Sequence, residues 1–576
     1  MRAVCNACAR AVDSRAFHIG LLCAGAVFLL VGAFHGNVWF DESYSVAIAG
    51  HSFSEIWRIG SGDVHPVLFY WALHVLYLVF GANVMVYRLF AVAGAVALAA
   101  LGLTHVRRDF GPRAGVLFTA FSCFAPYMAV ISTEIRMYSW AAFAVALCFF
   151  SAVRLCLAVR RAGASEVRLS ARMAAPLFAS SLAAAYLHYF GALAAFATNV
   201  LVLAVLLLHA RSCRRAIAAF LCGCAVQVAA YLPWLATVAG QVAVVSNTYW
   251  ANVVFPDTYI ELVTYPVVPS AVSFGLRGQY GAAAQMVLQG CLAAIALCIA
   301  AAAVAALVRG IGAARARRLG QSASGAGASG VAVARIGDAA WCAWAGVGVY
   351  AGVIALGFAA SEAMGSFILY YRYLFVAFGP LLAACAIAAA GMRPRIVAVL
   401  LCAALAGCSA TNMALTVHDN YDSANRAPLE ALAEAAAWAQ EGDDAGASGD
   451  VAAASETAAD TASASPVRAV SSDIGFAGVA AVEFPGIAQA YLDWQPGNWA
   501  LSYEAYAPAL ASVKSWDAAL ARCGDRFVAI GQTSDGSVPR DVADLDARDD
   551  VECVGMQTFY RPYERTYFTV ALMEKR

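Results

Sequence analysis

The segment HPVLFYWALHVLYLVFG, residues 65–81, decides the fold, because counting it as a membrane span or not sets the side on which every later loop lies. It belongs to a chain of 576 residues that is 62% hydrophobic, 13% charged and has no net charge. Apolar runs of about 20 residues, the length of a bilayer-spanning helix, recur from Ala16 to about Asn412. The composition therefore predicts a polytopic integral membrane protein, and no basic, aromatic-interleaved patch indicates nucleic-acid binding.

Arginine positions orient the predicted spans, because lysine occurs only at Lys514 and Lys575. The arginines gather in five clusters: Arg107, Arg108 and Arg113; Arg160, Arg161, Arg168 and Arg172; Arg211, Arg214 and Arg215; Arg315, Arg317 and Arg318; Arg393 and Arg395. The positive-inside rule places all of them in the cytoplasm, together with the N-terminus.

Residues 65–81 must then stay on one side of the membrane, since a span there would move every downstream cluster outside. We interpret the segment as a helix in the outer interface. It is short, it opens with His65-Pro66, and it carries His74 among aromatic residues that suit the headgroup region. The alternative is an ordinary span that is compensated elsewhere.

The resulting map predicts an all-α polytopic domain, residues 1–413, and a small extracytoplasmic α/β domain, residues 414–576. About eleven spans are expected: Ala16 to Phe34, Val86 to Val106, Ala114 to Ile131, Tyr138 to Val159, Ala174 to Phe190, Gly191 to His209, Ala216 to Val238, Ala282 to Val308, Ala339 to Ala360, Tyr373 to Ala390 and Ile396 to Asn412.

Two adjacent carboxylates follow the first span in WFDESY, residues 39–44. The same map places a set of ionisable and polar residues at or near the outer face, namely Asp41, Glu42, Glu134, Arg136, His188, Tyr189 and Arg372. A charge at the bilayer centre costs about 2.5–3.5 kcal/mol on insertion scales, so such a set near one face indicates a cavity. Taken singly, each residue also fits a solvated turn, a packed helix-end histidine or a helix-end anchor.

The order of these motifs along the chain resembles one family. The motifs are an outer-loop Asp-Glu, His65-Pro66 opening an interfacial helix, Tyr87-Arg88-Leu89-Phe90, Arg107-Arg108-Asp109-Phe110-Gly111, Glu134-x-Arg136-Met137-Tyr138, His188-Tyr189-Phe190-Gly191 and Tyr371-Arg372-Tyr373. From Ala16 to Asn412 the series resembles the C-class (GT-C) polytopic glycosyltransferases. The similarity is greatest to the bacterial branch related to protein O-mannosyltransferases and aminoarabinose transferases.

The resemblance implies a polyprenyl phosphate sugar as donor and an inverting transfer. It maps the first-loop acid to Asp41, its neighbour to Glu42, the second-loop acid to Glu134, and the phosphate-side cation to Arg136 or Arg372. A hydroxyl is a weak nucleophile at neutral pH, so a positioned carboxylate is a sensible general base, and Asp41 is the candidate.

A leaving phosphate needs stabilisation of its charge, which guanidinium groups provide through paired hydrogen bonds. The predicted donor-binding residues are Arg136, Arg372 and His188, joined by His65, Arg88, Tyr138, Tyr189 and Tyr373. A divalent cation held by Asp41 and Glu134 would serve the same purpose. Metal dependence stays open, and no cofactor is certain.

The loop from Ala239 to Gly281 is rich in aromatic and polar residues, which could stack on an acceptor sugar or form an interfacial belt.

A second region of interest lies beyond Asn412. There we expect a polar start and then an amphipathic helix over His418 to Glu441, with Pro428 near the first turn of the helix, and a flexible low-complexity loop over Gly442 to Pro466.

Beyond that loop, the outer domain is expected to contain strands and short helices. Strands are predicted at Val467 to Val470, Arg526 to Ile530 and Thr566 to Leu572, with a helix at Trp516 to Ala521. Cys523 and Cys553 could form a disulfide in an oxidising exterior, but the sequence does not show that they meet.

The favoured function is a glycosyltransferase of the bacterial cytoplasmic membrane, acting on a hydroxyl or amine of a glycan, lipid or protein acceptor at the outer face. The chain has no phosphate-binding G-x-x-x-x-G-K-S/T loop, which argues against a nucleotide-sugar enzyme. The alternatives are a secondary transporter or lipid flippase that uses the acids as substrate or proton sites, and a scaffold without catalysis.

Overall fold

The computed structural model describes residues 11–162, 165–248, 328–392, 396–447, 467–493 and 503–576, with a few single residues between 258 and 315. The chain divides into two compact units. Unit 1 comprises Met1–Phe34, His65–Phe69 and Arg88–Thr416, and unit 2 comprises His35–Val64, Tyr70–Tyr87 and Val417–Arg576. Unit 2 therefore joins the C-terminal region to two segments that lie early in the sequence.

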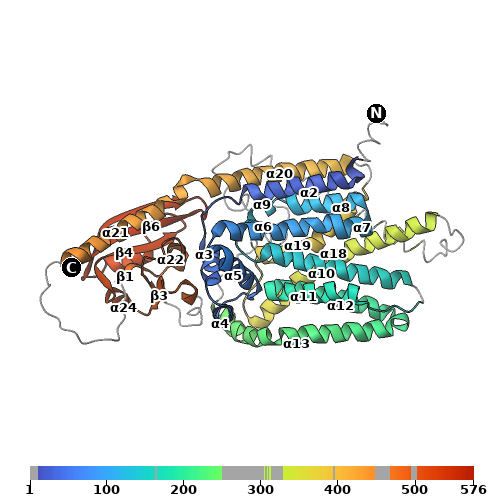
Figure 1. Ribbon diagram of the computed structural model, residues 1–576, viewed down its shortest axis with the longest axis horizontal. Helices are drawn as coiled ribbons and strands as arrows, with labels where there is room; N and C mark the ends of the chain where they lie inside the picture. Colours follow the sequence, from blue (N-terminus) through green and yellow to red (C-terminus); the bar gives the residue numbers. More distant parts are fainter. Residues whose placement is uncertain are drawn as a thin grey trace. The chain divides into compact units, whose positions relative to one another are not determined.

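Unit 1 is helical, and its long helices run side by side (Figure 1). The helices that form it or extend into it are α2 (Arg15–Val31), α6 (Val84–Leu101), the π-helix η1 (Gly102–Val106), α7 (Arg107–Phe110), α8 (Pro112–Phe124), α9 (Met128–Ile131), α10 (Tyr138–Ala162), α11 (Ala171–Leu187), α12 (Tyr189–Leu208), α13 (Ala210–Thr248), α18 (Ala328–Met364), the 3-10 helix η2 (Tyr371–Ala377), α19 (Phe378–Ala390) and α20 (Ile396–Tyr421).

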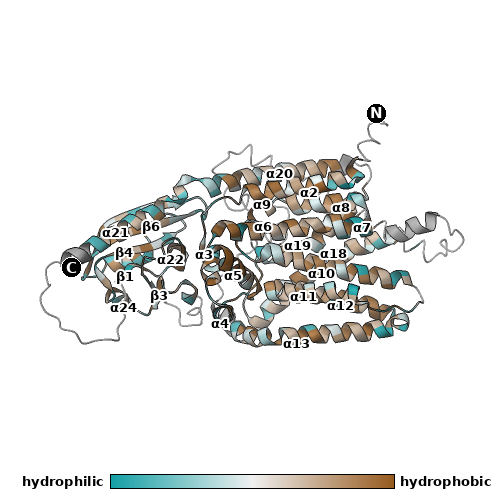
Figure 2. Ribbon diagram, viewed as in Figure 1, coloured by the Kyte–Doolittle hydropathy of each residue, from teal (hydrophilic) through white to brown (hydrophobic). Residues whose placement is uncertain are grey.

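In the described part of the chain, seven helical stretches are long and apolar enough to cross a membrane, and the ribbon in Figure 2 is coloured by the hydropathy of their residues. They are Val84–Phe110, Tyr138–Ala162, Tyr189–Leu208, Ala210–Val242, Gly337–Met364, Tyr371–Ala390 and Val399–Tyr421. Each corresponds to one predicted span, so a mostly helical multi-pass membrane protein is confirmed.

Three further predicted spans are shorter helices. Helices α2 and α11 have 17 residues each, and the predicted span from Ala114 to Ile131 is broken into α8 and α9. Ala125 precedes a proline and has an extended backbone, which ends α8, because the residue before proline avoids the helical region. The remaining prediction, Ala282 to Val308, lies almost entirely outside the described residues.

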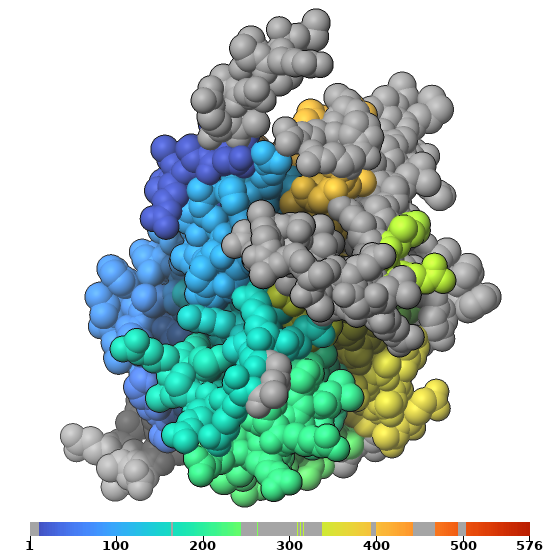
Figure 3. All heavy atoms as spheres, turned by 90° about the vertical axis from the view of Figure 1, so that its right-hand side faces the viewer, coloured from blue at the N-terminus to red at the C-terminus, as the bar shows by residue number. Residues whose placement is uncertain are grey.

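Among the described residues, arginines of two clusters lie at helix ends and pair with acids. Arg160 and Arg161, at the end of α10, lie 3.7 and 2.9 Å from carboxylate oxygens of Asp338. Arg113, at the start of α8, lies 3.1 Å from Asp13 near the N-terminus. Figure 3 shows the face on which these blue to green segments come together.

The other end of α10 carries the predicted site residues. The helix has 25 residues, which at 1.5 Å per residue gives a length of about 37 Å. Arg136 immediately precedes it and Arg161 lies in its last turn. The predicted site and an arginine cluster are thus at opposite ends of one helix, as the predicted topology requires.

Helix α5 (Leu68–Phe80) occupies the segment that decides the topology. It has 13 residues, about 20 Å, which is shorter than the hydrocarbon core of about 30 Å. In unit 2 it packs beside α4 (Phe53–Ser61), where the rings of Trp57 and Trp71 stack at 5.9 Å. This length agrees with the predicted interfacial helix rather than with a span.

A six-stranded sheet with the order β3-β2-β1-β4-β6-β5 forms the C-terminal α/β region of unit 2. The strands are β1 (Val467–Ser471), β2 (Gln489–Leu492), β3 (Leu510–Val513), β4 (Cys523–Thr533), β5 (Val551–Arg561) and β6 (Thr566–Lys575). Strands β1 to β4 are parallel, and β6 pairs antiparallel with both β4 and β5. Phe527, Leu492 and Met573 belong to its buried core.

The predicted strands at Val467, Arg526 and Thr566 are confirmed, and so is the helix at Trp516, now α24 (Trp516–Leu520). The sequence interpretation missed β2 and β3, which have four residues each and show too little periodicity to recognise. It also missed β5, α22 (Ile474–Glu483) and α25 (Arg540–Asp546).

The predicted polar start and helix between His418 and Glu441 are confirmed, with Pro428 in the first turn of the helix. Helix α20 continues to Tyr421, a 3-10 turn η3 (Ser423–Asn425) follows, and α21 (Ala427–Ala447) begins with proline at its second residue. Proline fits the first helical turn because its missing N–H has no intrahelical partner there. Cys523 and Cys553 are both free, and β6 lies between the strands that carry them.

Candidate functional site

The turn between α9 and α10 places the predicted acid and arginine. The backbone N–H of Arg136 donates to the carbonyl oxygen of Glu134 at 2.7 Å, which tightens the turn. Glu134 and Arg136 are 6% and 3% exposed, and Ile135 and Met137 beside them are fully buried. The charged pair is therefore held inside unit 1 rather than in solvent.

Arg372 joins this turn from a distant part of the sequence, near the start of η2. Its Nη2 lies 3.4 Å from Oε1 of Glu134, and its guanidinium carbon lies 5.8 Å from the centre of the Tyr138 ring. The second predicted arginine thus contacts the second-loop acid and an aromatic face. Cation–π contact and ion pairing hold its guanidinium plane in one orientation.

His65 contributes the next contact. Arg136 Nη2 donates toward the His65 imidazole, with 3.1 Å to Nε2. The His65 ring centre lies 6.1 Å from that of His188, in an edge-on arrangement. Two arginines, two histidines and one carboxylate from four separate segments therefore converge.

His188 occupies the break between α11 and α12, with an extended backbone at φ −160° and ψ 142°. Its Nδ1 accepts a hydrogen bond of 3.1 Å from the N–H of Phe190 and so caps α12. A neutral ring that accepts at Nδ1 carries its proton on Nε2. His188 is 4% exposed, and its Nε2 has no hydrogen-bond partner within the described parts of the chain.

The His188 ring lies 5.6 Å from the Tyr138 ring and 5.3 Å from the Tyr373 ring. We refer to His65, Glu134, Arg136, Tyr138, His188, Arg372 and Tyr373 as the arginine–histidine cluster. All seven belong to unit 1.

Two other predicted residues of unit 1 make different contacts. Arg88 is fully buried, and its Nη1 donates to the carbonyl oxygen of Thr133 at 3.1 Å, which supports the turn before α10. The Tyr189 hydroxyl accepts from Trp234 Nε1 at 3.1 Å and donates to Gln241, so it joins α12 to α13. Arg88 thus touches the backbone beneath the cluster, whereas Tyr189 contacts another helix.

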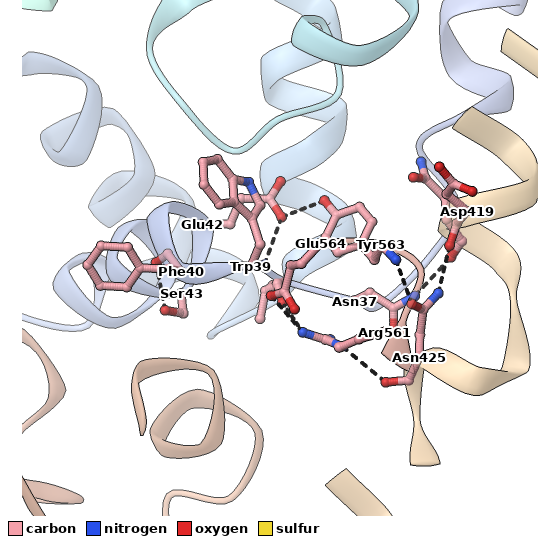
Figure 4. Close-up of polar contacts among 12 residues, drawn as sticks. Asn37, Trp39, Phe40, Glu42, Ser43, Asp419, Asn425, Arg561, Tyr563 and Glu564 are labelled. Atoms are coloured by element: carbon pink, nitrogen blue, oxygen red, sulfur yellow. Dashed lines mark hydrogen bonds and ion pairs between the residues drawn. The ribbon is translucent and has the colours of Figure 1, made fainter. Parts of the chain in front are cut away.

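Asp41 and Glu42 lie in unit 2, in the first turn of α3 (Phe40–Ala49), where carboxylates stabilise a helix N-terminus. Glu42 is fully buried, and its Oε2 accepts from the Tyr563 hydroxyl at 2.7 Å and from the Trp39 N–H at 3.4 Å (Figure 4). Asp41 is half-buried, and its backbone carbonyl accepts from the Ser45 hydroxyl at 3.1 Å.

Residues that the sequence interpretation missed surround Glu42. Arg561 is fully buried and donates to the carbonyl oxygens of Asn425 at 3.1 Å and Val38 at 3.0 Å, and to Glu564 at 2.8 Å (Figure 4). Burial raises the pKa of Glu564 to about 7. The sequence signal that could have identified Arg561 and Glu564 was the charged run RPYER, residues 561–565, directly before a predicted strand.

The same network continues to the end of α20. Tyr563 N–H donates to the Asn425 side-chain oxygen at 2.8 Å, and the Asn425 amide donates to the Asp419 carbonyl at 2.7 Å. Arg565 pairs with the Asp419 carboxylate at 2.6 Å. We refer to Glu42, Asp419, Asn425, Arg561, Tyr563, Glu564 and Arg565 as the C-terminal network.

No group of three or more histidine, cysteine, aspartate or glutamate side chains in the described ranges is arranged to hold a metal ion. The suggested metal ligands Asp41 and Glu134 belong to different units. The aromatic residues of the predicted loop from Ala239 to Gly281 lie outside the described residues. Helix α13 covers the start of that range and continues to Thr248.

Comparisons with known proteins give two similar structures. No protein family and no curated protein matches the sequence. Crystal structures of ArnT from Cupriavidus metallidurans, in the apo state and bound to undecaprenyl phosphate, align with TM-scores of 0.46 each, at 16% and 14% identity. The alignments cover 96% and 97% of this chain, and 97% and 98% of the ArnT chains. At these values they assign neither a family nor an activity to this chain.

Proposed function

We propose that this protein is a GT-C membrane glycosyltransferase. It transfers a monosaccharide from a polyprenyl phosphate donor to a hydroxyl or amine acceptor at the outer face of the cytoplasmic membrane, with inversion. The observation that carries the proposal is the convergence of Arg136, Arg372, His65 and His188, all buried or half-buried, in one cluster of unit 1. The order of motifs along the chain gives independent support to the proposal.

The cluster suits the phosphate of a lipid-linked donor. Guanidinium groups bind phosphate oxygens through two parallel N–H donors, and low exposure strengthens such hydrogen bonds. His188 adds a buried Nε2–H, because its Nδ1 is occupied by the Phe190 N–H. Glu134 orients one of the arginines through its contact with Arg372 at 3.4 Å.

In the proposed reaction, the acceptor oxygen or nitrogen attacks the anomeric carbon as the bond from that carbon to the phosphate oxygen breaks. The acceptor proton passes to a carboxylate, and polyprenyl phosphate leaves with the bonding electron pair. The arginines stabilise the charge that develops on the phosphate, which is the kind of electrostatic contribution that enzymes preorganise.

Asp41 is the proposed general base, on the basis of the family resemblance and its position in the first turn of α3. Glu42 holds that turn, since its carboxylate accepts from Tyr563 and from the Trp39 backbone. We therefore separate the predicted acid pair into a catalytic Asp41 and a positioning Glu42.

The test measures release of free polyprenyl phosphate from a panel of polyprenyl phosphate sugars, using purified protein and a crude envelope fraction as acceptor. Wild type should release the lipid from at least one donor, whereas Asp41→Asn and Arg136→Gln should lose most of the activity. Arg161→Gln is the matched control, because Arg161 pairs with Asp338 at the other end of α10.

Release that is equal in wild type and Asp41→Asn would reject Asp41 as the base but keep the reaction class. Absence of release from every donor, by folded protein with acceptor present, would reject the transferase. Movement of an intact lipid-linked sugar across proteoliposomes would then establish a flippase.

A further inference from the structure

The parallel part of the unit 2 sheet contains a reversal of strand order. From β1 the chain moves outward through β2 to β3, and then returns to place β4 on the opposite side of β1. The connections that leave the carboxyl ends of β1 and β4 therefore diverge. In open α/β sheets this divergence creates a crevice where ligands commonly bind.

A cavity of about 560 Å³ lies at this position. Its walls come from the segment after β1, from β2, from the carboxyl half of β4 and from the start of α25. They include Ser472, Asp473, Tyr491, Gln532, Arg540 and Asp541. The volume is within the range of about 300–1,000 Å³ that small-molecule sites occupy. None of these residues belongs to the arginine–histidine cluster or the C-terminal network.

Hydrogen bonds fix the walls of this cavity. The Asp541 carboxylate accepts from the Ser472 N–H at 2.5 Å and from the Ser472 hydroxyl, which ties α25 to the end of β1. Asp473 accepts from the Gly475 N–H at 2.7 Å and caps α22. A site built from such fixed elements loses little entropy when a ligand binds.

The charge of the cavity disfavours an anion, although a helix begins at its wall. The described lining residues include two carboxylates, Asp473 and Asp541, and a single arginine. Arg540 has an 86% exposed side chain and pairs with Asp544 at 3.4 Å. A phosphate at the α22 N-terminus would meet both carboxylates, which repel it.

The remaining lining groups match a ligand with many hydroxyls. The Tyr491 hydroxyl accepts from the Tyr503 hydroxyl at 3.3 Å, which leaves its own O–H able to donate. Gln532 supplies an amide that donates and accepts, and the carboxylates accept from hydroxyls. The Tyr491 ring adds an aromatic surface of the kind that packs against the apolar side of a sugar ring.

We propose that this cavity is a binding site for an uncharged saccharide unit. The site is separate from the proposed donor site, and binding is measured without transfer, so its failure and the failure of the proposed function are distinguishable. If both hold, the cavity provides a second saccharide-binding site in addition to the proposed donor site.

The experiment is saturation-transfer NMR with detergent-purified full-length protein. The probes are methyl α-glucoside, methyl α-mannoside and methyl α-galactoside, with glucose 6-phosphate and inorganic phosphate as the anionic arm. Wild type should bind at least one neutral glycoside. Ile474→Trp, which places an indole in the cavity, should abolish that signal.

Gln532→Ala and Tyr491→Phe keep the main chain intact, and each should weaken binding about fivefold, as expected for one lost hydrogen bond. Gln557→Ala, on the exposed edge strand β5, is the matched control and should bind like wild type. If Ile474→Trp unfolds, the two milder variants decide the question.

Three results would overturn the proposal: no saturation of any neutral glycoside by wild type, binding of the phosphate probes alone, or neutral binding that Gln532→Ala, Tyr491→Phe and Ile474→Trp all leave unchanged. Each would mean that the cavity is not a site for an uncharged saccharide.

Discussion

The arginine–histidine cluster of unit 1 and the C-terminal network of unit 2 use similar side chains in different ways. In the C-terminal network, contacts are short, from 2.6 Å for Arg565–Asp419 to 3.1 Å for Arg561 with the Asn425 carbonyl. In the cluster, the Arg136–His65 and Arg372–Glu134 contacts are 3.1 and 3.4 Å. Arg561 bonds to two backbone carbonyls, whereas the Arg136–His65 and Arg372–Glu134 contacts join side chains.

The difference separates a structural use of buried charge from a ligand-binding use. A buried arginine that donates to backbone carbonyl groups fixes the chain that carries those groups. The Arg372–Glu134 contact of 3.4 Å, beside the buried His188 Nε2–H, is suited to rearrange around an anion. Substitutions in the network should therefore change stability first, and substitutions in the cluster should change activity first.

Arg561→Met should have the largest effect. It leaves Glu564 buried without its arginine and removes hydrogen bonds to Asn425 and Val38, so we expect a loss of about 3–5 kcal/mol in the free energy of unfolding. Denaturant unfolding of the purified protein measures this loss. Arg576→Met, whose partner Glu552 is exposed, should change it by no more than about 0.5 kcal/mol. Equal stability of Arg561→Met and Arg576→Met would contradict a structural role for the C-terminal network.

Arg136→Gln tests the arginine–histidine cluster. We expect transfer activity to fall about 100-fold or more, because a cation that stabilises the leaving phosphate is lost. The free energy of unfolding should fall by about 1–3 kcal/mol, as for one broken buried hydrogen bond, and so by less than in Arg561→Met. Activity assays and denaturant unfolding on one preparation separate the two quantities. An unfolded Arg136→Gln protein would show that the cluster, like the network, is structural.

His188→Asn isolates one hydrogen-bond donor. Asparagine is a good N-cap residue and can still accept from the Phe190 N–H, but it has no group equivalent to the Nε2–H. We expect activity to fall about tenfold or more, as for a hydrogen bond to a charged group, with stability close to that of wild type. His188→Ala removes the cap as well and should lower both. Full activity of His188→Asn would exclude the histidine from donor binding.

The smallest effect concerns pH in the α/β region. Burial, with Asp541 nearby, raises the pKa of Asp473 from 3.8 to about 6. Between these values the folded state binds more protons than the unfolded state, so this group makes stability fall as pH rises, with a slope of at most about 1.4 kcal/mol per pH unit. Asp473→Asn keeps a capping oxygen and should flatten the stability profile between about pH 4 and 6. An unchanged profile would contradict the raised pKa.

Hydropathy was sufficient to predict most of the described long helices of unit 1. Seven long helices coincide with predicted spans, because a span of about 20 apolar residues is a local property of the sequence. The break at Ala125 was missed, although Pro126 after it was a visible signal. In the α/β region, the strands with marked apolar runs were predicted, and the four-residue strands β2 and β3 were not.

The sequence by itself determined the residue types of the candidate site and their order along the chain. Only the tertiary structure decided their partners: Arg372 with Glu134, His65 with Arg136, and Glu42 with Tyr563. Hydrophobic periodicity records which face of an element is buried, and therefore survives in a local stretch of sequence. A pairing between residues 238 or 521 positions apart depends on how the whole chain packs, and no local pattern encodes it.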